Sequence, residues 1–164
     1  MKRPAQLLLT AVAFDVYWTL VVVFRERGIF LWLALAILAC LMLPHTQRRD
    51  ALLLALAGSA LDTAWVLTGL IKFNSTALLP LWMVALWLMF ATVWSRLTSM
   101  TTLSRWLLVL SGTVGGPVAY AIGEYLGAIT FLEPTAIVLS WMVCGWLVLM
   151  LLFHVLMGRQ QCAR

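Results

Sequence analysis

The chain has 164 residues, of which 64% are hydrophobic and 10% are charged, and its formal net charge is +5. Soluble domains carry about 25% charged residues, so this chain cannot present a hydrated surface to water on every side. The composition argues against soluble catalytic and nucleic-acid-binding domains. The basic residues fall mostly in short segments between apolar runs, which is how membrane proteins fix their orientation. We therefore expect no nucleic-acid partner.

Six apolar runs follow one another along the chain. A spanning helix needs roughly 20 mostly apolar residues, and the segments between the runs contain charged residues, proline or small polar residues. The pattern predicts an all-α, polytopic membrane protein of about six transmembrane helices, folded as one domain over residues 1–164. No internal repeat is evident, and the two three-helix halves cannot be aligned. The predicted helices cover residues 4–24, 28–44, 51–71, 78–97, 103–125 and 135–157.

The Lys and Arg residues are divided unequally between the two predicted sides of the membrane. The first, third and fifth loops hold three: Arg25, Arg27 and Lys72. The two termini and the remaining loops hold eight: Lys2, Arg3, Arg48, Arg49, Arg96, Arg105, Arg159 and Arg164. Since basic residues stay in the cytoplasm, both termini are predicted to be cytoplasmic.

Two carboxylates lie inside predicted spans. Asp15 falls in the first and Asp62 in the third, each about 16–18 Å from its cytoplasmic end at 1.5 Å per residue. An ionisable group at this depth is costly and is usually functional. Trp65 follows Asp62 by three residues and shares its helix face.

The fifth predicted helix carries a stripe of glycine and polar residues. Tyr120 and Glu124 lie four apart on it, and two glycine pairs have the small-xxx-small spacing that lets helices approach closely. We predict a small, outward-opening polar pocket where the first, third and fifth helices converge, lined by Asp15, Asp62, Trp65, Tyr120 and Glu124. The glycines predicted to pack helices are Gly58, Gly69, Gly112, Gly116, Gly123 and Gly127.

Each of these features also has a purely structural interpretation. Asp15 and Asp62 would then hydrogen-bond a neighbouring helix, and Glu124 would pair with Arg25, Arg27 or Lys72. The glycines would serve packing alone. His45 and His154 stand without ligand-like companions, so we expect no metal site. The chain has no phosphate-binding or nucleotide-binding motif, and we expect no cofactor.

Three segments together resemble a known family. They are Gly58-Ser59-Ala60-Leu61-Asp62 with Thr68-Gly69, Leu79-Pro80-Leu81-Trp82 with Leu86-Trp87-Leu88-Met89-Phe90-Ala91, and Gly116-Pro117-Val118-Ala119-Tyr120 with Gly123 and Gly127. In this order, and at this chain length, they resemble DUF2878, a family of small bacterial inner-membrane proteins of no established function. The resemblance implies a multi-pass protein of the bacterial inner membrane and supplies no catalytic residues.

Three functions remain open at this stage. The first is an accessory protein of envelope or lipid metabolism that binds a lipid head group or a small polar ligand in the pocket. The second is an intramembrane lipid-modifying enzyme that uses the carboxylates as general acid and base. The third is a small proton- or cation-coupled transporter. The expected partners are membrane lipid and either a second copy or another membrane protein.

Overall fold

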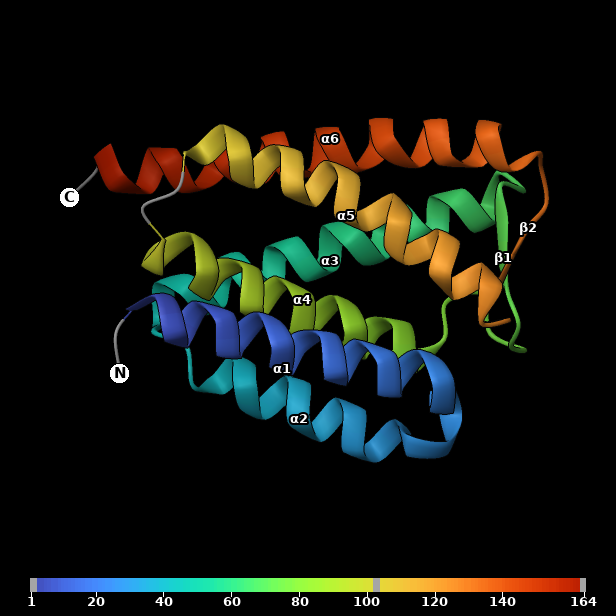
Figure 1. The fold of residues 1–164 in the computed structure, drawn as a ribbon, viewed down its shortest axis with the longest axis horizontal. Coiled ribbons are helices and arrows are strands. Elements are labelled where there is room, and N and C mark those ends of the chain that lie inside the picture. The colour runs from blue at the N-terminus through green and yellow to red at the C-terminus, as the bar shows by residue number, and fades with distance from the viewer. Residues whose placement is uncertain (1–2, 102–103, 163–164) are drawn as a thin grey trace. The chain divides into compact units, whose positions relative to one another are not determined.

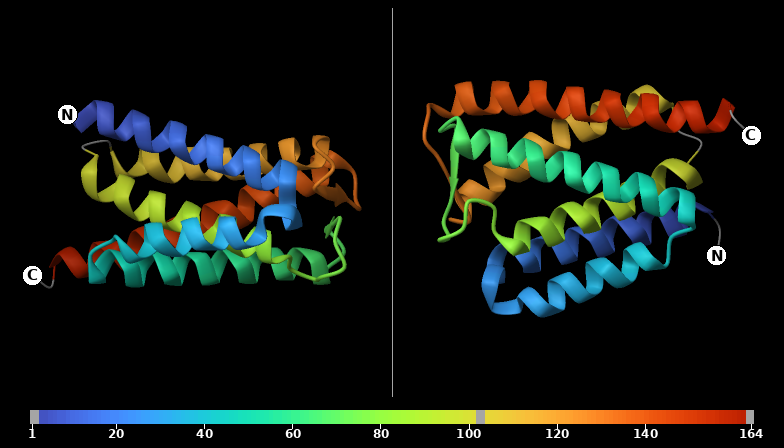
Figure 2. Two further views of the ribbon diagram at one scale, coloured as in Figure 1. Left: turned by 90° about the horizontal axis from the view of Figure 1, so that it is seen from below. Right: turned by 180° about the vertical axis from the view of Figure 1, so that it is seen from behind.

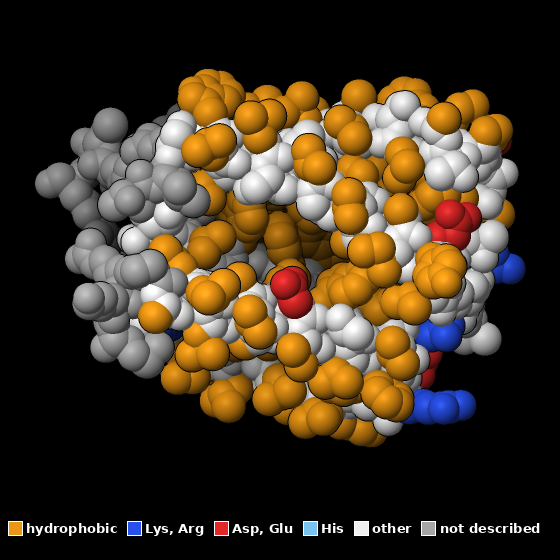
Figure 3. All heavy atoms as spheres, in the orientation of Figure 1, with side chains coloured by type: hydrophobic (Ala, Val, Ile, Leu, Met, Phe, Trp, Pro, Cys, Tyr) orange, Lys and Arg blue, Asp and Glu red, His pale blue; other side chains and the backbone are white. Residues whose placement is uncertain are grey.

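The computed structural model describes residues 3–101 and 104–162, and side chains within these ranges except at 3, 4, 105 and 156–162. Lys2 and Arg164, which contribute to the orientation count, lie outside the described residues. Hydrophobic side chains cover most of the visible face of the molecule (Figure 3). Apolar residues on several helices are strongly exposed, among them Leu8 at 67%, Phe30 at 87% and Trp141 at 62%, as expected for side chains that contact lipid.

The described chain is helical except for two short strands and the connections (Figure 1). Both strands have three residues and pair with each other in antiparallel fashion. The elements in order are α1 (Arg3–Phe24), the 3-10 helix η1 (Arg25–Gly28), α2 (Ile29–Leu41), α3 (His45–Leu67), β1 (Ile71–Phe73), α4 (Leu81–Met100), α5 (Arg105–Tyr125), β2 (Ile129–Phe131) and α6 (Thr135–Cys162).

The all-α membrane fold is confirmed, but five rather than six segments of the described chain are long and apolar enough to cross a membrane. The predicted first and second helices join through η1 into one helical segment, Ala5–Leu41. With 13 residues, α2 extends only about 20 Å, which is shorter than a typical span. The other four segments are His45–Leu67, Leu81–Met100, Trp106–Tyr125 and Thr135–Val155.

The α3 helix departs most from its predicted bounds. It begins at His45, although the sequence predicts a polar loop up to Asp50, and it ends at Leu67. The polar first turns belong to the helix and make structural contacts. The Arg48 guanidinium donates to the carbonyls of Leu41 and Leu43 at 2.5 and 3.1 Å. These carbonyls lie at the end of α2 and just beyond it, where helical partners are lacking.

The chain divides into two compact units, the first comprising residues 1–59 and 79–102 and the second residues 60–78 and 103–164. In the first unit α4 packs beside both α1 and α2. The Tyr17 hydroxyl donates to the Trp32 carbonyl at 2.9 Å, and the Trp32 indole N–H donates to the Arg25 carbonyl at 3.0 Å. These bonds hold the α1–η1–α2 turn, which Figure 2 shows from two further directions.

The main packing of the second unit is between α5 and α6. Gly116 lies directly under the buried indole of Trp146, and a Cβ at this position would overlap the ring. Its neighbour Gly115 has open space where its Cβ would be. Two adjacent glycines of one helix therefore have different roles, because only Gly116 is required for close approach.

This difference predicts opposite effects of alanine at the two positions. Gly116→Ala should lower the free energy of unfolding by about 1–3 kcal/mol, because the Trp146 ring must move to admit a methyl group. Gly115→Ala should leave it unchanged or raise it by up to about 1 kcal/mol, because alanine favours the helix. Denaturant unfolding of the two variants in the same detergent measures both values. Equal changes in the free energy of unfolding for the two variants would contradict the close packing of Gly116 against Trp146.

Candidate functional site

The second unit contains two copies of one local structure. A turn at Gly69, whose φ is +75°, follows the end of α3, and 58 residues later a turn at Gly127, whose φ is +68°, follows the end of α5. Only glycine adopts this conformation without cost. Corresponding bonds close the turns: Leu70 N–H donates to the Trp65 carbonyl and Ala128 N–H to the Gly123 carbonyl, both at 2.9 Å.

A three-residue strand follows each turn, and the two strands pair symmetrically. Lys72 lies opposite Thr130 at the centre of the ladder, and these two residues are also 58 apart. The flanking bonds match as well: Leu132 N–H donates to the Leu70 carbonyl and Asn74 N–H to the Ala128 carbonyl, both at 3.1 Å. The two copies are therefore related by a local two-fold axis through the centre of the ladder.

The helices that follow the strands also begin alike. The carbonyl of Pro80 accepts from the N–H groups of Met83 and Val84, and that of Pro134 accepts from Ile137 and Val138. The chain thus contains a repeat of helix, left-handed glycine, strand, proline and helix, made by α3–β1–α4 and α5–β2–α6. The expectation of no internal repeat is wrong. A short sequence signal was present, because Gly-x-Ile-x-Phe occurs at residues 69–73 and 127–131.

Asp62 and Tyr120 occupy equivalent positions in this repeat, again 58 residues apart, and they meet. The Tyr120 hydroxyl donates a short hydrogen bond to Asp62 Oδ1. The Asp62 side chain has no exposed surface and Tyr120 is 5% exposed. A carboxylate from one copy and a phenol from the other therefore form a buried polar pair between α3 and α5.

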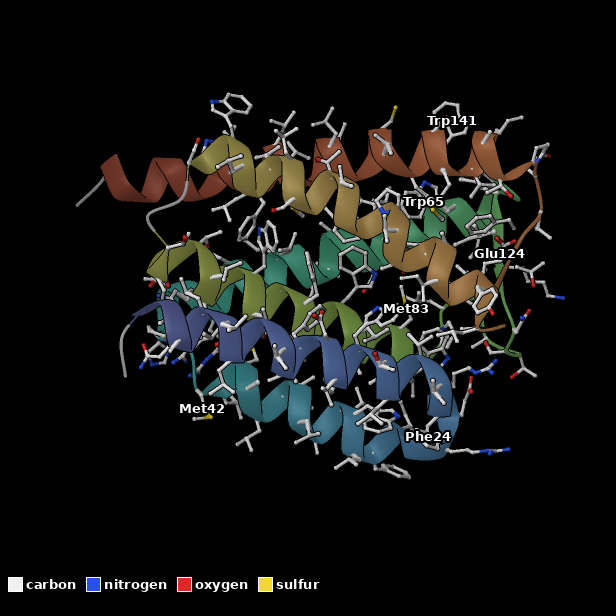
Figure 4. All side chains as sticks on the ribbon, in the orientation of Figure 1. Phe24, Met42, Trp65, Met83, Glu124 and Trp141 are labelled. Atoms are coloured by element: carbon white, nitrogen blue, oxygen red, sulfur yellow. The ribbon has the colours of Figure 1, made fainter. Side chains whose placement is uncertain are left out.

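Trp65 completes the surroundings of this pair. Its indole meets the Tyr120 ring edge to face, with ring centroids 5.5 Å apart, and it is 7% exposed. Gly145 of α6 makes room for it, because a Cβ there would lie 2.8 Å from the indole. Figure 4 labels Trp65 on α3. Asp62, Trp65 and Tyr120, three of the five predicted pocket residues, are thus brought together.

The pair lies closer to one end of its helices than the sequence suggested. Asp62 and Tyr120 each precede the last residue of their helix by five positions, or about 8 Å. The shift follows from α3, which begins and ends earlier than expected; the depth of Asp62 in the membrane stays a prediction. The β1–β2 ladder follows directly from these helix ends, so the pair lies beneath it.

Glu124 lies one turn beyond Tyr120 on α5, near the end that leads to β2 (Figure 4). Its Oε1 accepts the backbone N–H of Phe131 at 3.3 Å, so it supports the turn into β2. The ladder is also held by Asn74, whose amide donates to the Gly127 carbonyl at 2.9 Å and whose Oδ1 accepts from the Thr130 hydroxyl at 3.0 Å.

Asp15 is an exposed residue of α1 and belongs to the first unit. Asp62 belongs to the second, so the predicted pocket shared by the two carboxylates stays a prediction.

The six glycines expected to pack helices have different surroundings. Gly58 lies directly under the Trp87 ring, as Gly116 does under Trp146, and Gly123 has ordinary van der Waals space beside Ile129. Gly112 is buried within α5. Gly69 and Gly127 have no atom within 4 Å of the place where a Cβ would lie, and they serve the helix-ending turns instead.

Comparison with known proteins places the chain in a family. The family model for DUF2878, described as a protein of unknown function, matches residues 7–152. The chain belongs to the DUF2878 family. The match covers the first copy of the repeat, the second copy up to residue 152, and the Asp62–Tyr120 pair. No curated protein and no solved structure matches the chain.

The hydrogen bond between Asp62 and Tyr120 predicts that removing the Tyr120 hydroxyl lowers the stability of the protein. Tyr120→Phe should lower the free energy of unfolding by about 1–3 kcal/mol, because it leaves a buried carboxylate oxygen without its phenol donor. Tyr125→Phe is the matched control, since Tyr125 is 89% exposed, and it should change stability by less than about 0.5 kcal/mol. Denaturant unfolding in detergent compares the two. A Tyr120 variant as stable as the control would contradict the pair.

Proposed function

We propose that this chain is a binding protein of the bacterial inner membrane that recognises a positively charged amine, with Asp62, Tyr120 and Trp65 as the recognition residues. The observation that carries the proposal is the composition of the site. A carboxylate supplies the counter-charge for an ammonium group, and aromatic rings attract cations through their faces. Two sources offer this chemistry: the amine of a phospholipid head group and a small soluble amine.

The position of the pair supports a ligand of this kind. It lies about 8 Å from the helix ends, within reach of a lipid head group at the membrane surface, beneath the β1–β2 ladder. Because Asp62 is fully buried, the ligand must displace the Tyr120 hydroxyl from the carboxylate. Pro117 lies inside α5, three residues before Tyr120, and removes one helical hydrogen bond there. This weak point lets the end of α5 that carries Tyr120 move.

A proton- or cation-coupled transporter is the second candidate, because one observation favours it. Many transporters consist of repeats, and their sites lie where the repeats meet. Asp62 and Tyr120 occupy equivalent positions of such a repeat. A transporter requires in addition a path from this pair to both faces of the membrane, which a binding protein does not.

The binding proposal predicts stabilisation by amines that depends on Asp62. Ethanolamine added to the protein in detergent tests a soluble amine, and lipid nanodiscs of phosphatidylglycerol with or without phosphatidylethanolamine test the head group. A ligand at about 100 times its Kd should stabilise the protein by about 2.7 kcal/mol, measured as a rise in the unfolding midpoint. A higher unfolding midpoint with ethanolamine identifies a soluble amine as the ligand, and a higher midpoint in nanodiscs with phosphatidylethanolamine identifies the lipid head group.

Two variants separate specific binding from a general effect of charge. Asp62→Asn should abolish the stabilisation because the counter-charge is lost. Glu133→Gln removes an exposed carboxylate just before α6 and should retain the stabilisation in full. The proposal fails if neither amine stabilises the wild-type protein, or if Asp62→Asn responds as strongly as the wild type.

A further inference from the structure

Asp15 lies in the middle of α1, in the first unit, and its carboxylate has no partner among the described residues of that unit. It is the thirteenth of 22 residues, about 18 Å from the start of the helix and about 14 Å from its end. The side chain is exposed, and no hydrogen bond or ion pair joins its carboxylate to another described residue of the first unit. The Thr19 hydroxyl donates to the backbone carbonyl of Asp15 at 2.8 Å and not to its carboxylate.

The residues around Asp15 form a continuous exposed strip, which we call the Asp15 face and define as Leu8, Val12, Asp15 and Thr19. Leu8 is 67% and Val12 50% exposed, and Thr19 is exposed too. The successive spacings of four, three and four residues match the seam along which two helices pack at a small angle. Lipid tails solvate the apolar members of this strip, but they cannot solvate the carboxylate.

The chain itself offers no cation at this depth. The segments 4–24, 28–44, 51–71, 78–95 and 106–153 contain no Lys, Arg or His. The basic residues lie in the connections, near the ends of the chain, or in the first or last two turns of a helix, as Arg48 does in α3 and Arg96 in α4. A charge partner for Asp15 within the membrane must therefore come from another molecule.

We propose that the Asp15 face is the docking surface for a transmembrane helix of another membrane protein, which carries one Lys or Arg at mid-depth. Charge complementarity assigns the basic residue, because acidic and basic side chains inside a membrane pair with each other. The helix-packing spacing of the apolar residues on one side of Asp15 assigns a helix rather than a free cation. This inference is independent of the amine site, which is built from other residues.

The test uses a defined probe. A synthetic transmembrane peptide of alternating Leu and Ala with one central Lys is compared with the same peptide carrying Leu at the centre. Energy transfer between the labelled peptide and the labelled full chain is measured in phosphatidylcholine vesicles. The Lys peptide should bind the wild-type chain about tenfold more tightly than the Leu peptide, as for a polar contact between membrane helices.

Variants of the chain assign the preference to Asp15. Asp15→Leu suits a membrane helix and should bind both peptides equally. Glu26→Gln removes an exposed carboxylate beyond the end of α1 and should keep the tenfold preference. Asp15→Lys should reverse it, preferring a peptide with a central Asp. Thermal unfolding of each variant in the same vesicles identifies any variant that fails to fold, and the remaining variants decide.

Three results would overturn the inference. The first is equal binding of the Lys and Leu peptides by the wild-type chain. The second is a Lys preference that persists in Asp15→Leu. The third is energy transfer between two labelled copies of the chain that depends on Asp15 and excludes the peptide, since the occupant of the face would then be a second copy.

Discussion

A carboxylate buried in an apolar interior must be hydrogen-bonded, and the second unit is organised around this requirement. Asp62 has no exposed surface, so removing a hydrogen-bond donor from its carboxylate is costly. Tyr120 supplies that donor, and the bond joins α3 to α5. The other contacts of the site follow from it: Trp65 packs edge to face on Tyr120, and Gly145 yields the space that Trp65 needs.

The repeat explains why these two residues meet. In each copy a left-handed glycine ends the helix and sends the chain into a strand, and the two strands pair about their common centre. Residues equally distant from the two glycines are thereby brought to corresponding places on either side of the local axis. The copies differ at the position where they touch, one carrying an acceptor and the other a donor. Two identical carboxylates at this place would repel each other if ionised, so this difference between the copies is what allows the contact.

Membrane character, the approximate positions of the helices and the family could be predicted from the sequence, because long apolar runs have few alternatives in a bilayer. Asp62, Trp65 and Tyr120 were also found, because polar groups inside such runs are conspicuous. Other features were not accessible in this way. The polar residues 45–50 resembled a loop, although Arg48 satisfies carbonyls near the end of α2. Gly69 and Gly127 resembled packing glycines, since both close helix packing and a left-handed turn favour glycine and residue type alone does not distinguish them. The repeat was missed because only Gly-x-Ile-x-Phe is shared around the turns, while Asp62 and Tyr120 differ.

The most direct test of this account is a double-mutant cycle on the pair, with Asp62→Leu and Tyr120→Phe made singly and together and their unfolding free energies measured in one detergent. Tyr120→Phe alone leaves a buried carboxylate without this donor, whereas the double variant replaces both polar partners by apolar groups, which is close to neutral. The account predicts that the double variant is more stable than Tyr120→Phe alone, with a coupling free energy of about 1–3 kcal/mol. Two destabilising effects that simply add would contradict the hydrogen bond and the arrangement built on it.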